Sequence, residues 1–528
     1  MVYIIGILAF LAVYLFVGLF TSKKVKDLND YYVAGRNAPT ILIVGSLVAS
    51  FLSTGAFLGE TGEVYSGYLI PQSIVGVLCS VGYLWGGIGF GKYLRRSGVL
   101  TVSEYYGKRF CSSRMQKLAA ITSLLAVLAY MLSAIQGITT LMSALTGLDY
   151  KLCVIIAWAS FTFFTISSGS IGVLLTDTIM FLVFTVATVV AMPYITQQAG
   201  GWMEAIKSLA TSQTLPDIIS WHGNLDHGYA NEISNLIWGL VYGLVWAITI
   251  SVSPWQTSRY LMAKNEHVVL RSSVWASIGV MTLQVMLYFI ASFIYKINPD
   301  LVPTQCMIWA AQNTMPTLIG VVLLAGIMSA GISSASTFLS LIGFAITNDL
   351  LPKQNVDEKN KLKFSRLGML IASIVILIIA YLNPPQIYVI MYFGSSVIAS
   401  AWGAVSFASI WSKKISENGA FWGMLSGFVV CSLVKILSAF YPGKWPILLE
   451  PFILGMIASV FGIIIGSKLR PAKGEEQTER AFLFQIPDGE LEPAQIKKTK
   501  HTGYYYLIFA VAVFAFFWFL WAVPYLNA

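Results

Sequence analysis

Charged residues are scarce in this chain. Only 11% of its 528 residues are Asp, Glu, Lys or Arg, whereas 57% are hydrophobic, and the mean hydropathy is +0.73. A soluble protein of this length needs far more charge to cover its surface, so the composition excludes a soluble globular domain. Long apolar runs stand where the charge is missing, and they predict a polytopic membrane protein.

Cysteine and histidine are also scarce. The five cysteines form no CxxC pair, fall mostly within apolar stretches and are best explained as packing residues; they are Cys79, Cys111, Cys153, Cys306 and Cys431. The four histidines include His222 and His227 in one loop, and they make no metal-binding pattern. The sequence therefore predicts neither a disulfide framework nor a transition-metal site.

Catalytic and nucleotide-binding signatures are missing. There is no P-loop and no GxGxxG pattern that opens a helix after a strand, and Gly86-Gly87-Ile88-Gly89 within an apolar stretch indicates close helix packing instead. No nucleophile–base pair or set of metal ligands falls at a common depth in the membrane. We therefore expect no enzyme activity.

The apolar runs predict fourteen membrane helices. They cover roughly 2–20, 41–66, 69–91, 117–145, 150–168, 171–195, 232–254, 270–295, 306–346, 366–383, 386–411, 418–440, 446–467 and 503–523. The stretch 306–346 is too long for one straight crossing, so we expect a helical lead-in before a span that starts near Leu318. The first run lacks a basic start and a small-residue cleavage site, which favours a retained helix over a signal peptide.

The basic residues predict the orientation. If the N-terminus is outside, the inner segments hold 28 of the 33 Lys and Arg residues; these segments are 21–40, 92–117, 255–271, 347–366, 412–417 and 468–502. Inner loops favour Lys and Arg, so both termini should lie outside. The net charge of +9 then belongs to the inner face and the lipid headgroups, and nucleic-acid binding is not needed to explain it. By composition, the last of these segments is a solvated connector.

Asp177 is the most informative polar residue, because it lies inside an apolar run. A carboxylate in hydrocarbon costs roughly 2.5 kcal/mol or more, so something cationic or strongly polar must compensate it. The apolar stretch 325–340 offers five hydroxyls, on Ser333, Ser334, Ser336, Thr337 and Ser340. Such hydroxyls often bond to their own backbone, which would explain one or two of them. An all-oxygen set with a single carboxylate otherwise suggests a hard monovalent cation.

The run 41–66 carries a second polar cluster. Its centre, from Ser50 to Gly55, combines glycine and hydroxyl residues with Phe51 and Leu52. The small residues permit either a helix break that frees carbonyls for a cation or a continuous, closely packed helix. Glu60 could be a gate residue, a proton site or a carboxylate that reaches external water, and the last role is the expected one for Glu63. Phe51, Tyr130, Trp246 and Trp255 could form an aromatic pocket or simply pack in the membrane.

Over about residues 30–470 the chain resembles the sodium/solute symporter family, which includes sodium-coupled glucose, proline, pantothenate, sialic acid and choline transporters. The motifs that carry the resemblance are Asp30-Tyr-Tyr-Val-Ala-Gly-Arg36, Thr101-Val-Ser-Glu-Tyr-Tyr-Gly-Lys-Arg-Phe110, Leu175-Thr-Asp-Thr178, the run from Ser253 to Lys264, Ser333-Ser-Ala-Ser-Thr337, Thr347-Asn-Asp349 and Ile410-Trp-Ser-Lys-Lys414. Each motif alone is a moderate signal. Their order and their places in the predicted topology make the combination specific.

The resemblance implies an all-α membrane protein with a core of five plus five helices in inverted repeat, and with a discontinuous first helix in each half. The expected parts are an N-terminal helix and basic loop (1–40), the first repeat (41–195), an external loop (196–231), the second repeat (232–411), two accessory helices (412–467), the inner connector (468–502) and a C-terminal membrane helix (503–528).

The resemblance also implies where sodium binds. The principal site would use the carbonyls of Ala49, Leu52 and Ala330 with the hydroxyls of Ser333 and Ser334, and Asp349 at the helix end fixes this register. Some family members have a second sodium site, which maps to Asp177, Ser336 and Thr337. Two ions in each cycle are therefore plausible, and the alternative is one ion with Asp177 tuning the main site.

The family's solute pocket maps approximately to Phe51, Thr54, Gln72, Tyr130, Trp246, Ser251 and Trp255, with Glu60 at an outer-gate position that is usually apolar. Phe51 stands where sugar transporters place an amide, and 117–145 lacks the arginine with which sialic acid transporters bind a carboxylate. These departures put a sugar or a large acidic sugar in doubt as the solute.

We therefore expect a multi-pass plasma (inner) membrane symporter that couples Na⁺, as co-substrate, to a small polar organic solute by alternating access. One alternative is the same fold coupled to protons through Asp177 or Glu60. Another is a transporter-like solute sensor, although the inner segments are short for an output domain.

Overall fold

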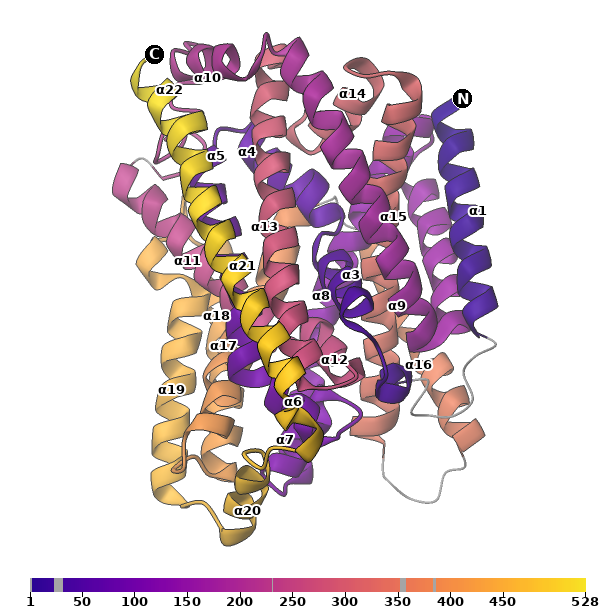
Figure 1. Ribbon diagram of the computed structural model, residues 1–528, viewed down its shortest axis with the longest axis vertical. Helices are drawn as coiled ribbons and strands as arrows, with labels where there is room; N and C mark the ends of the chain where they lie inside the picture. Colours follow the sequence, from indigo (N-terminus) through magenta and orange to yellow (C-terminus); the bar gives the residue numbers. More distant parts are fainter. Residues whose placement is uncertain (1, 23–31, 230, 352–357, 383–385) are drawn as a thin grey trace.

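The computed structural model describes residues 2–22, 32–229, 231–351, 358–382 and 386–528, and their regular structure is a bundle of helices (Figure 1). Outside the helices, the pairing found among these residues is an isolated bridge between Ala38 and Ala263. The long helices run nearly side by side along the long axis of the molecule.

Eleven helices of the described chain are long and apolar enough to cross a membrane, and a bent pair brings the number to twelve. The bent pair is α3 (Thr40–Phe51) with the segment from η2 (Gly55–Glu60) to α4 (Thr61–Tyr65). The first half continues with α5 (Leu69–Gly86), η3 (Gly87–Gly91), α6 (Lys92–Ser97), α7 (Val102–Arg109), α8 (Ser113–Thr146), α9 (Tyr150–Gln198) and the short α10 (Trp202–Ala210).

The second half begins with α11 (Glu232–Val252), α12 (Pro254–Met262), α13 (Glu266–Ile297), η4 (Pro303–Gln305), α14 (Cys306–Asn313), α15 (Thr317–Phe344), η5 (Ala345–Leu350), α16 (Glu358–Leu382) and α17 (Ile387–Trp411). It is followed by α18 (Glu417–Ala439), η6 (Ile447–Leu449), α19 (Pro451–Leu469), α20 (Gly474–Phe482), η7 (Asp488–Leu491), α21 (Pro493–Phe517), η8 (Trp518–Ala522) and α22 (Val523–Leu526). The first membrane helix, α1, covers Val2–Ser22.

The structure confirms the all-helical architecture and refines several spans. The stretch 306–346 is divided into the lead-in α14 and the long α15, as expected. The two spans predicted at 150–168 and 171–195 belong to one helical element, α9, within which Tyr150–Phe163 and Gly172–Gln198 are the apolar parts. The span that begins at 232 was predicted to end at 254, but helix resumes as α12, because Pro254 occupies the first turn of a new helix rather than ending one.

Polar caps set where several helices begin. The side chains of Thr101, Ser112, Asn265 and Ser416 each accept a hydrogen bond from a backbone amide in the first turn of α7, α8, α13 and α18, respectively. Such caps satisfy amides that have no partner within the helix. At the other end of α8, Gly147 ends the helix with a φ of +69°, which favours glycine.

The two termini lie at the same end of the bundle, and α6, α7 and α20 lie at the opposite end (Figure 1). All seven basic residues of 92–117 belong to α6, α7 or the start of α8, so the end opposite the termini is the basic end of the molecule. This agrees with the predicted orientation. At the same end, the Arg36 side chain donates to the carbonyls of Gly98 (2.6 Å) and Val99 (2.9 Å), while Asp30 and Tyr31 of its motif lie outside the described residues.

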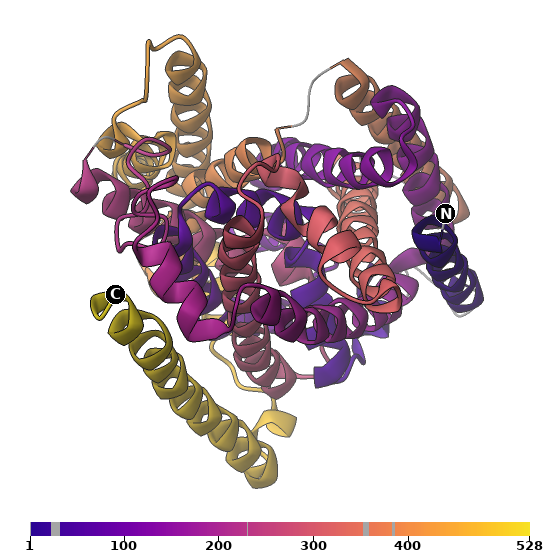
Figure 2. The same ribbon diagram turned by 90° about the horizontal axis from the view of Figure 1, so that it is seen from above.

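The segment 468–502 is not the solvated connector that its composition suggested. Arg96 donates through Nη1 to the Leu483 carbonyl, and Arg109 donates to the Glu476 carbonyl at 2.9 Å. Because buried arginines of the first half need acceptors, they hold this segment against the basic end. The last membrane helix, α21, begins at Pro493 rather than 503 and packs at the periphery of the bundle (Figure 2).

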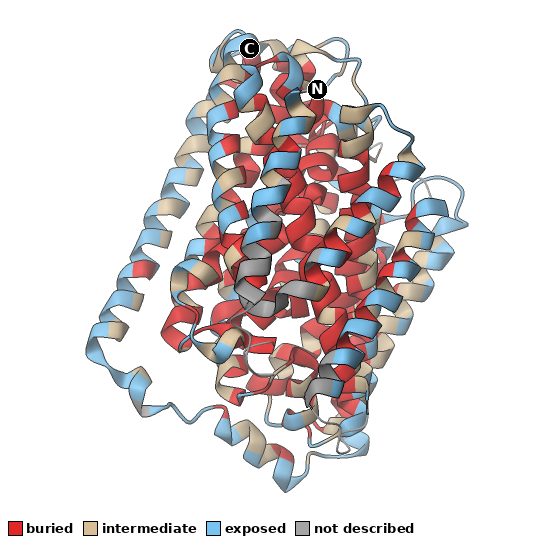
Figure 3. Ribbon diagram, turned by 90° about the vertical axis from the view of Figure 1, so that its right-hand side faces the viewer, coloured by how far each residue is buried: buried red, intermediate tan, exposed pale blue. Residues whose placement is uncertain are grey.

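The interior of the bundle is buried, whereas the outward faces of the peripheral helices are exposed (Figure 3). The exposed residues include many large apolar side chains, such as Phe163, Leu182 and Phe514. An exposed apolar surface of this extent fits lipid rather than water. Asp177, Glu60 and the hydroxyl residues of α15 that the sequence analysis selected lie in the buried interior.

Candidate functional site

The first helix of the core is broken at its centre, and the break frees two carbonyls. At Leu52 the backbone leaves the helix (φ −73°, ψ 76°), and the two arms, Thr40–Phe51 and Gly55–Tyr65, meet at 48°. In a continuous helix the amides of Ser53 and Ala56 would bond to Ala49 and Leu52. Here they bond instead to the carbonyls of Phe51 (2.7 Å) and Ser53 (3.0 Å). The carbonyls of Ala49 and Leu52 are therefore left available to a cation.

Two glycines let neighbouring helices approach the break. A Cβ atom at Gly137 of α8 would lie 2.2 Å from Thr54 Oγ1, and one at Gly331 of α15 would lie 2.7 Å from Thr54 Cγ2. The Thr54 side chain thus sits where α8 and α15 both lack side chains. Its hydroxyl donates to the Ala134 carbonyl at 3.3 Å. The break in α3 consequently lies directly against the hydroxyl-rich part of α15.

The hydroxyls of α15 divide into three kinds. Ser340 donates to the Ser336 carbonyl of its own helix, as hydroxyl residues in membrane helices often do. Ser333 and Thr337 are bonded to charged groups on other helices. The hydroxyls of Ser334 and Ser336 are buried and have no hydrogen-bond partner within the described chain. A buried hydroxyl without a partner is costly, and a species bound at Ser334 would remove that cost.

Asp177 is fully buried in α9 and joins three elements. Ser46 of α3 donates to its Oδ2 at 2.5 Å, and Ser333 of α15 donates to its Oδ1. The close approach of α3 depends on Gly45, where a Cβ would lie 2.6 Å from Thr178 Oγ1. Asp177 therefore ties the broken helix to α15 on the side of the break that faces the basic end.

Asp177 also has a cationic partner that the sequence analysis missed. The sequence left it without a counterion, but the Arg259 Nη2 of α12 lies 3.4 Å from Asp177 Oδ2. The same nitrogen donates to Thr337 Oγ1 at 2.6 Å. The sequence analysis placed Arg259 in the inner segment 255–271. The signal that could have found it is Pro254, read as the first residue of a helix.

The second half of the core has its own break. Ser253 is extended (φ −62°, ψ 146°) between α11 and α12. Several buried polar atoms around it lack a hydrogen-bond partner among the residues that the structure describes: Trp246 Nε1, Ser253 Oγ, Trp255 Nε1 and Gln256 Oε1. Gln256 also donates to Ser50 Oγ at 3.3 Å, which joins the second break to the first.

The predicted aromatic residues do form one group. Phe51 lies 5.4 Å from Trp246, and Tyr130 lies 6.1 Å from Trp246 and 5.4 Å from Trp255, measured between ring centroids. Phe338 of α15, which the sequence analysis did not select, completes the group at 4.7 Å from Tyr130. The group lies between the two breaks and presents two unpartnered indole N–H donors.

Two other predicted pocket residues differ in their surroundings. Ser251 does not present its hydroxyl to this group, because it donates to the carbonyls of Ala247 (2.7 Å) and Gly82 (2.8 Å) in the contact between α11 and α5. Gln72 belongs to a separate polar cluster. It donates to Tyr288 Oη at 3.4 Å and accepts from Tyr388 Oη at 3.3 Å.

Glu60 belongs to the same cluster as Gln72. Its side chain is buried, with Oε2 accepting from Tyr288 Oη (2.7 Å) and Gln284 Nε2 (3.1 Å), and it makes no ion pair within the described residues. A carboxylate that reaches external water was one of the three roles considered for Glu60. In this conformation Glu60 does not have that role. Glu63, in contrast, is partly exposed and contacts His227 Nε2 at 2.9 Å. Tyr288 and Gln284, spaced by four residues on α13, were not predicted.

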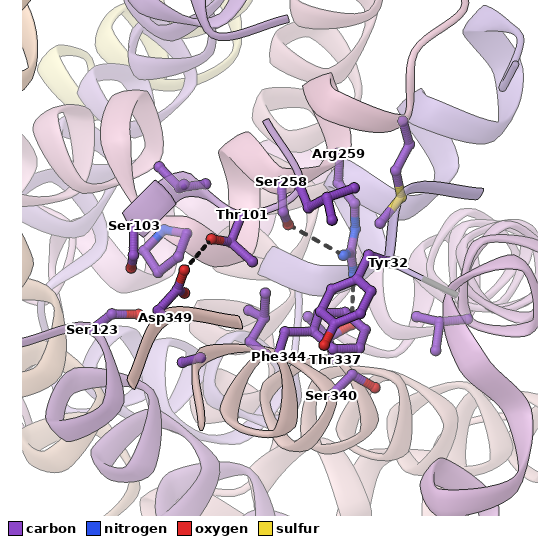
Figure 4. Close-up of a pocket in the computed structure, with 17 residues that line it drawn as sticks. Tyr32, Thr101, Ser103, Ser123, Ser258, Arg259, Thr337, Ser340, Phe344 and Asp349 are labelled. Carbon is purple, nitrogen blue, oxygen red and sulfur yellow. Dashed lines mark hydrogen bonds between the residues drawn. The ribbon is translucent and has the colours of Figure 1, made fainter. Parts of the chain in front are cut away.

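A cavity extends from this region toward the basic end (Figure 4). Its lining includes Arg259 and Thr337 at one side and Asp349 at the other. Asp349 Oδ1 accepts from Thr101 Oγ1 at 2.7 Å and from Gln116 Nε2 at 2.9 Å, so two of the sequence motifs meet here. Tyr32 closes a further wall through a 2.6 Å hydrogen bond between its hydroxyl and that of Thr347.

Comparison with known proteins places this geometry in context. A family model described as the sodium:solute symporter family matches residues 31–427. The sodium/pantothenate symporter of Escherichia coli (strain K12) is 24% identical over 484 residues, covering 89% of this chain and 98% of the relative. The sodium/glucose cotransporter 1 of Oryctolagus cuniculus is 25% identical over 475 residues, covering 80% of this chain and 70% of the relative.

Solved structures show the same fold. A Na⁺-coupled sialic acid symporter in a substrate-bound outward-open state superposes with a TM-score of 0.76 at 19% identity, over 90% of this chain and 98% of the other. Mhp1, a nucleobase-cation-symport-1 family transporter, superposes with a TM-score of 0.56 at 12% identity, over 86% of this chain and 98% of the other. At these identities the likeness concerns the fold alone, a helical core in inverted repeat with discontinuous helices.

Proposed function

We propose that this chain, which belongs to the sodium:solute symporter family, imports a small polar organic solute by alternating access, with sodium bound between the first broken helix and α15. Membership of the family makes it a multi-pass plasma membrane protein that couples sodium to solute transport. The residues that bind the ion and the solute, and the nature of the solute, are the parts that we propose here.

The observation that carries the proposal is the meeting of freed carbonyls with the unpartnered hydroxyl of Ser334. Ala49 and Leu52 lie between Ser46, which is linked through Asp177 to Ser333, and Thr54, which lies against Gly331. From these neighbours we infer that the carbonyls of the break face the 330–334 turn of α15. We assign the main ion to the carbonyls of Ala49, Leu52 and Ala330 and the hydroxyls of Ser333 and Ser334. Oxygen donors of this kind suit a hard cation such as Na⁺.

Sodium would act as a bridge between the two elements. Because the ligands come from both α3 and α15, binding holds the break in one geometry, and the solute contacts that same break. Linkage then requires that sodium raises the affinity for the solute and that the solute raises the affinity for sodium. One ion that moves down about 100 mV contributes roughly 2.3 kcal/mol from the potential alone. That supports roughly a fiftyfold solute gradient before the sodium gradient is counted.

The aromatic group between the breaks is the proposed solute pocket. Phe51, Tyr130, Trp246 and Trp255 supply its apolar walls, Thr54 lies at the break, and Gln72 lies in the outer polar cluster beside Glu60. The two indole N–H groups without partners are donors, so we expect the solute to offer oxygen acceptors, as carboxylates, carbonyls and hydroxyls do. Ser251, whose hydroxyl is used in helix packing, is expected to shape the pocket rather than to bind the solute.

The test uses purified protein in proteoliposomes. A thermal-shift screen against a metabolite library, with and without sodium, identifies the solute. Uptake of that solute is then measured for the wild type, for Ser333→Ala with Ser334→Ala, and for Ser340→Ala. We expect the double variant to lose sodium-driven uptake and Ser340→Ala to keep it, because Ser340 bonds only within its own helix. Undiminished uptake by the double variant would reject the site.

A second candidate is proton coupling through Glu60, since this buried carboxylate is held by neutral donors alone. It predicts uptake that survives replacement of sodium by choline and that is lost in Glu60→Gln. Sodium-dependent uptake that persists in Glu60→Gln would reject it. Measured solute flux of either kind would also reject a sensor without transport.

A further inference from the structure

Arg259 occupies much of the place where a second sodium ion would bind. The second set of proposed ligands is Asp177, Ser336 and Thr337. The Arg259 Nη2 lies 2.6 Å from Thr337 Oγ1 and 3.4 Å from Asp177 Oδ2. Figure 4 shows the guanidinium reaching past Ser258 toward Thr337 at the edge of the cavity. Two of the three side chains are thus already bonded to one cation that belongs to the chain itself.

The remaining donors are engaged as well. Asp177 Oδ1 accepts from Ser333, and Oδ2 accepts from Ser46 in addition to Arg259. Within the described chain, Ser336 alone of this second set keeps a hydroxyl without a partner. A carboxylate with two hydroxyl donors and a guanidinium is satisfied without any further ion. The set as it stands does not fit a second sodium.

Charge leads to the same conclusion. The carboxylate and the guanidinium are both buried, at 0% and 3% side-chain exposure, and together they are neutral. A sodium ion added at Asp177 would lie beside a guanidinium that is bonded to the same carboxylate oxygen. Two cations on one buried oxygen repel each other strongly. A second ion could bind only if Arg259 left.

We propose that Arg259 is a built-in cation that takes the place of the second sodium, so that this chain binds one sodium ion in each transport cycle. This inference rests on the proposed function, because it concerns the ions of the same transport site. Arg259 acts through Asp177 and Ser333 and is therefore a positioning residue for the main ion. Its Nη2 contacts both acceptors, while Nη1 donates to Ser258 Oγ at 3.5 Å.

The experiment counts sodium ions with ²²Na⁺ as the probe, on purified full-length protein in nanodiscs and without solute. We expect the wild type to saturate at one ion per chain. Arg259→Gln leaves Asp177 as an unpaired buried carboxylate, so we expect it to bind two ions per chain. Arg259→Gln with Asp177→Asn removes both charges and should return to one. Arg271→Gln is the matched control, because it removes another buried arginine whose guanidinium donates to Gln495 instead.

Ser336→Ala keeps the test decisive should Arg259→Gln fail to fold. The Ser336 hydroxyl has no partner, so its removal should leave both the fold and the sodium isotherm unchanged, within twofold in Kd. Two ions bound by the wild type, a single ion bound by folded Arg259→Gln, or a tenfold weaker isotherm in Ser336→Ala would each overturn the inference. Failure of the proposed function has a different signature, namely a wild type that binds no sodium at all.

Discussion

Gly45→Ala probes how closely α3 must approach Asp177. A Cβ at this position would lie 2.8 Å from the Thr178 Cα, which is backbone and cannot rotate away. Ordinary contact begins at 3.4 Å, so α3 and α9 would have to separate by about 0.6 Å. If this movement is passed on in full, the 2.5 Å hydrogen bond from Ser46 to Asp177 lengthens to about 3.1 Å.

The functional cost follows from that bond. A hydrogen bond to a charged group contributes about 1.5–3 kcal/mol, and weakening it shifts the carboxylate that orients Ser333. If half of this energy is lost from the ion-bound state, sodium affinity falls roughly four- to thirteenfold. The assay is ²²Na⁺ binding to purified protein, with the unfolding temperature measured in parallel.

Gly279→Ala is the matched control for this prediction. Its Cβ would lie 3.6 Å from Val48 Cγ2, an ordinary contact on another face of the same helix α3. We expect its sodium Kd to stay within twofold of the wild type. If Gly45→Ala also kept a wild-type Kd and a wild-type unfolding temperature, the reasoning that ties ion affinity to this close approach would be refuted.

Three further substitutions test other parts of the account. Trp255→Phe keeps an aromatic ring but removes the unpartnered indole N–H, so it should weaken solute binding severalfold in a thermal-shift titration. Because the smaller ring leaves a cavity, the unfolding temperature without solute should also fall, and solute affinity is the readout; unchanged solute affinity would place the solute elsewhere. Thr101→Val removes both the cap of α7 and the bond to Asp349, so the unfolding temperature should drop by a few degrees. Thr282→Val, on the exposed face of α13, is the control and should not lower it. Equal unfolding temperatures for the two variants would contradict this prediction. Arg96→Gln breaks the 2.5 Å ion pair with Glu266 and the hydrogen bond to the Leu483 carbonyl, so a protease should cleave the segment 468–502 faster than in the wild type. Equal cleavage rates would show that Arg96 does not hold this segment against the basic end.

Much of the fold could be predicted from the sequence, because long apolar runs indicate membrane helices and basic charge indicates the inner loops. The division of 306–346 into α14 and α15 followed from length alone. The prediction that was wrong concerned the segment 468–502, which was expected to be solvated but packs against the basic end. Its polar composition is the same whether the segment is solvated or bonded to Arg96 and Arg109, and composition does not reveal such long-range partners.

The sequence predicted which residues gather at the site better than it predicted the hydrogen bonds between them. The small residues from Ser50 to Gly55 allowed either a break or close packing, and the structure contains both, a break at Leu52 with Thr54 set against two glycines. The aromatic residues did come together. Arg259 was missed because a proline can end a helix or begin one, and only the packing of α12 distinguishes the two. The role of Glu60 could not be decided from the sequence either, because its hydrogen-bond donors Gln284 and Tyr288 lie more than two hundred positions away along the chain.

The central claim is that the break in α3 and the 330–334 turn of α15 hold one sodium ion. Cryo-EM maps of the purified protein in sodium chloride and in potassium chloride test it most directly. We predict a density peak in sodium alone, bounded by the carbonyls of Ala49, Leu52 and Ala330 and the hydroxyls of Ser333 and Ser334, with Arg259 still on Asp177. A sodium map with no peak between these groups, or with the peak at Asp177 and Arg259 displaced, would contradict the account.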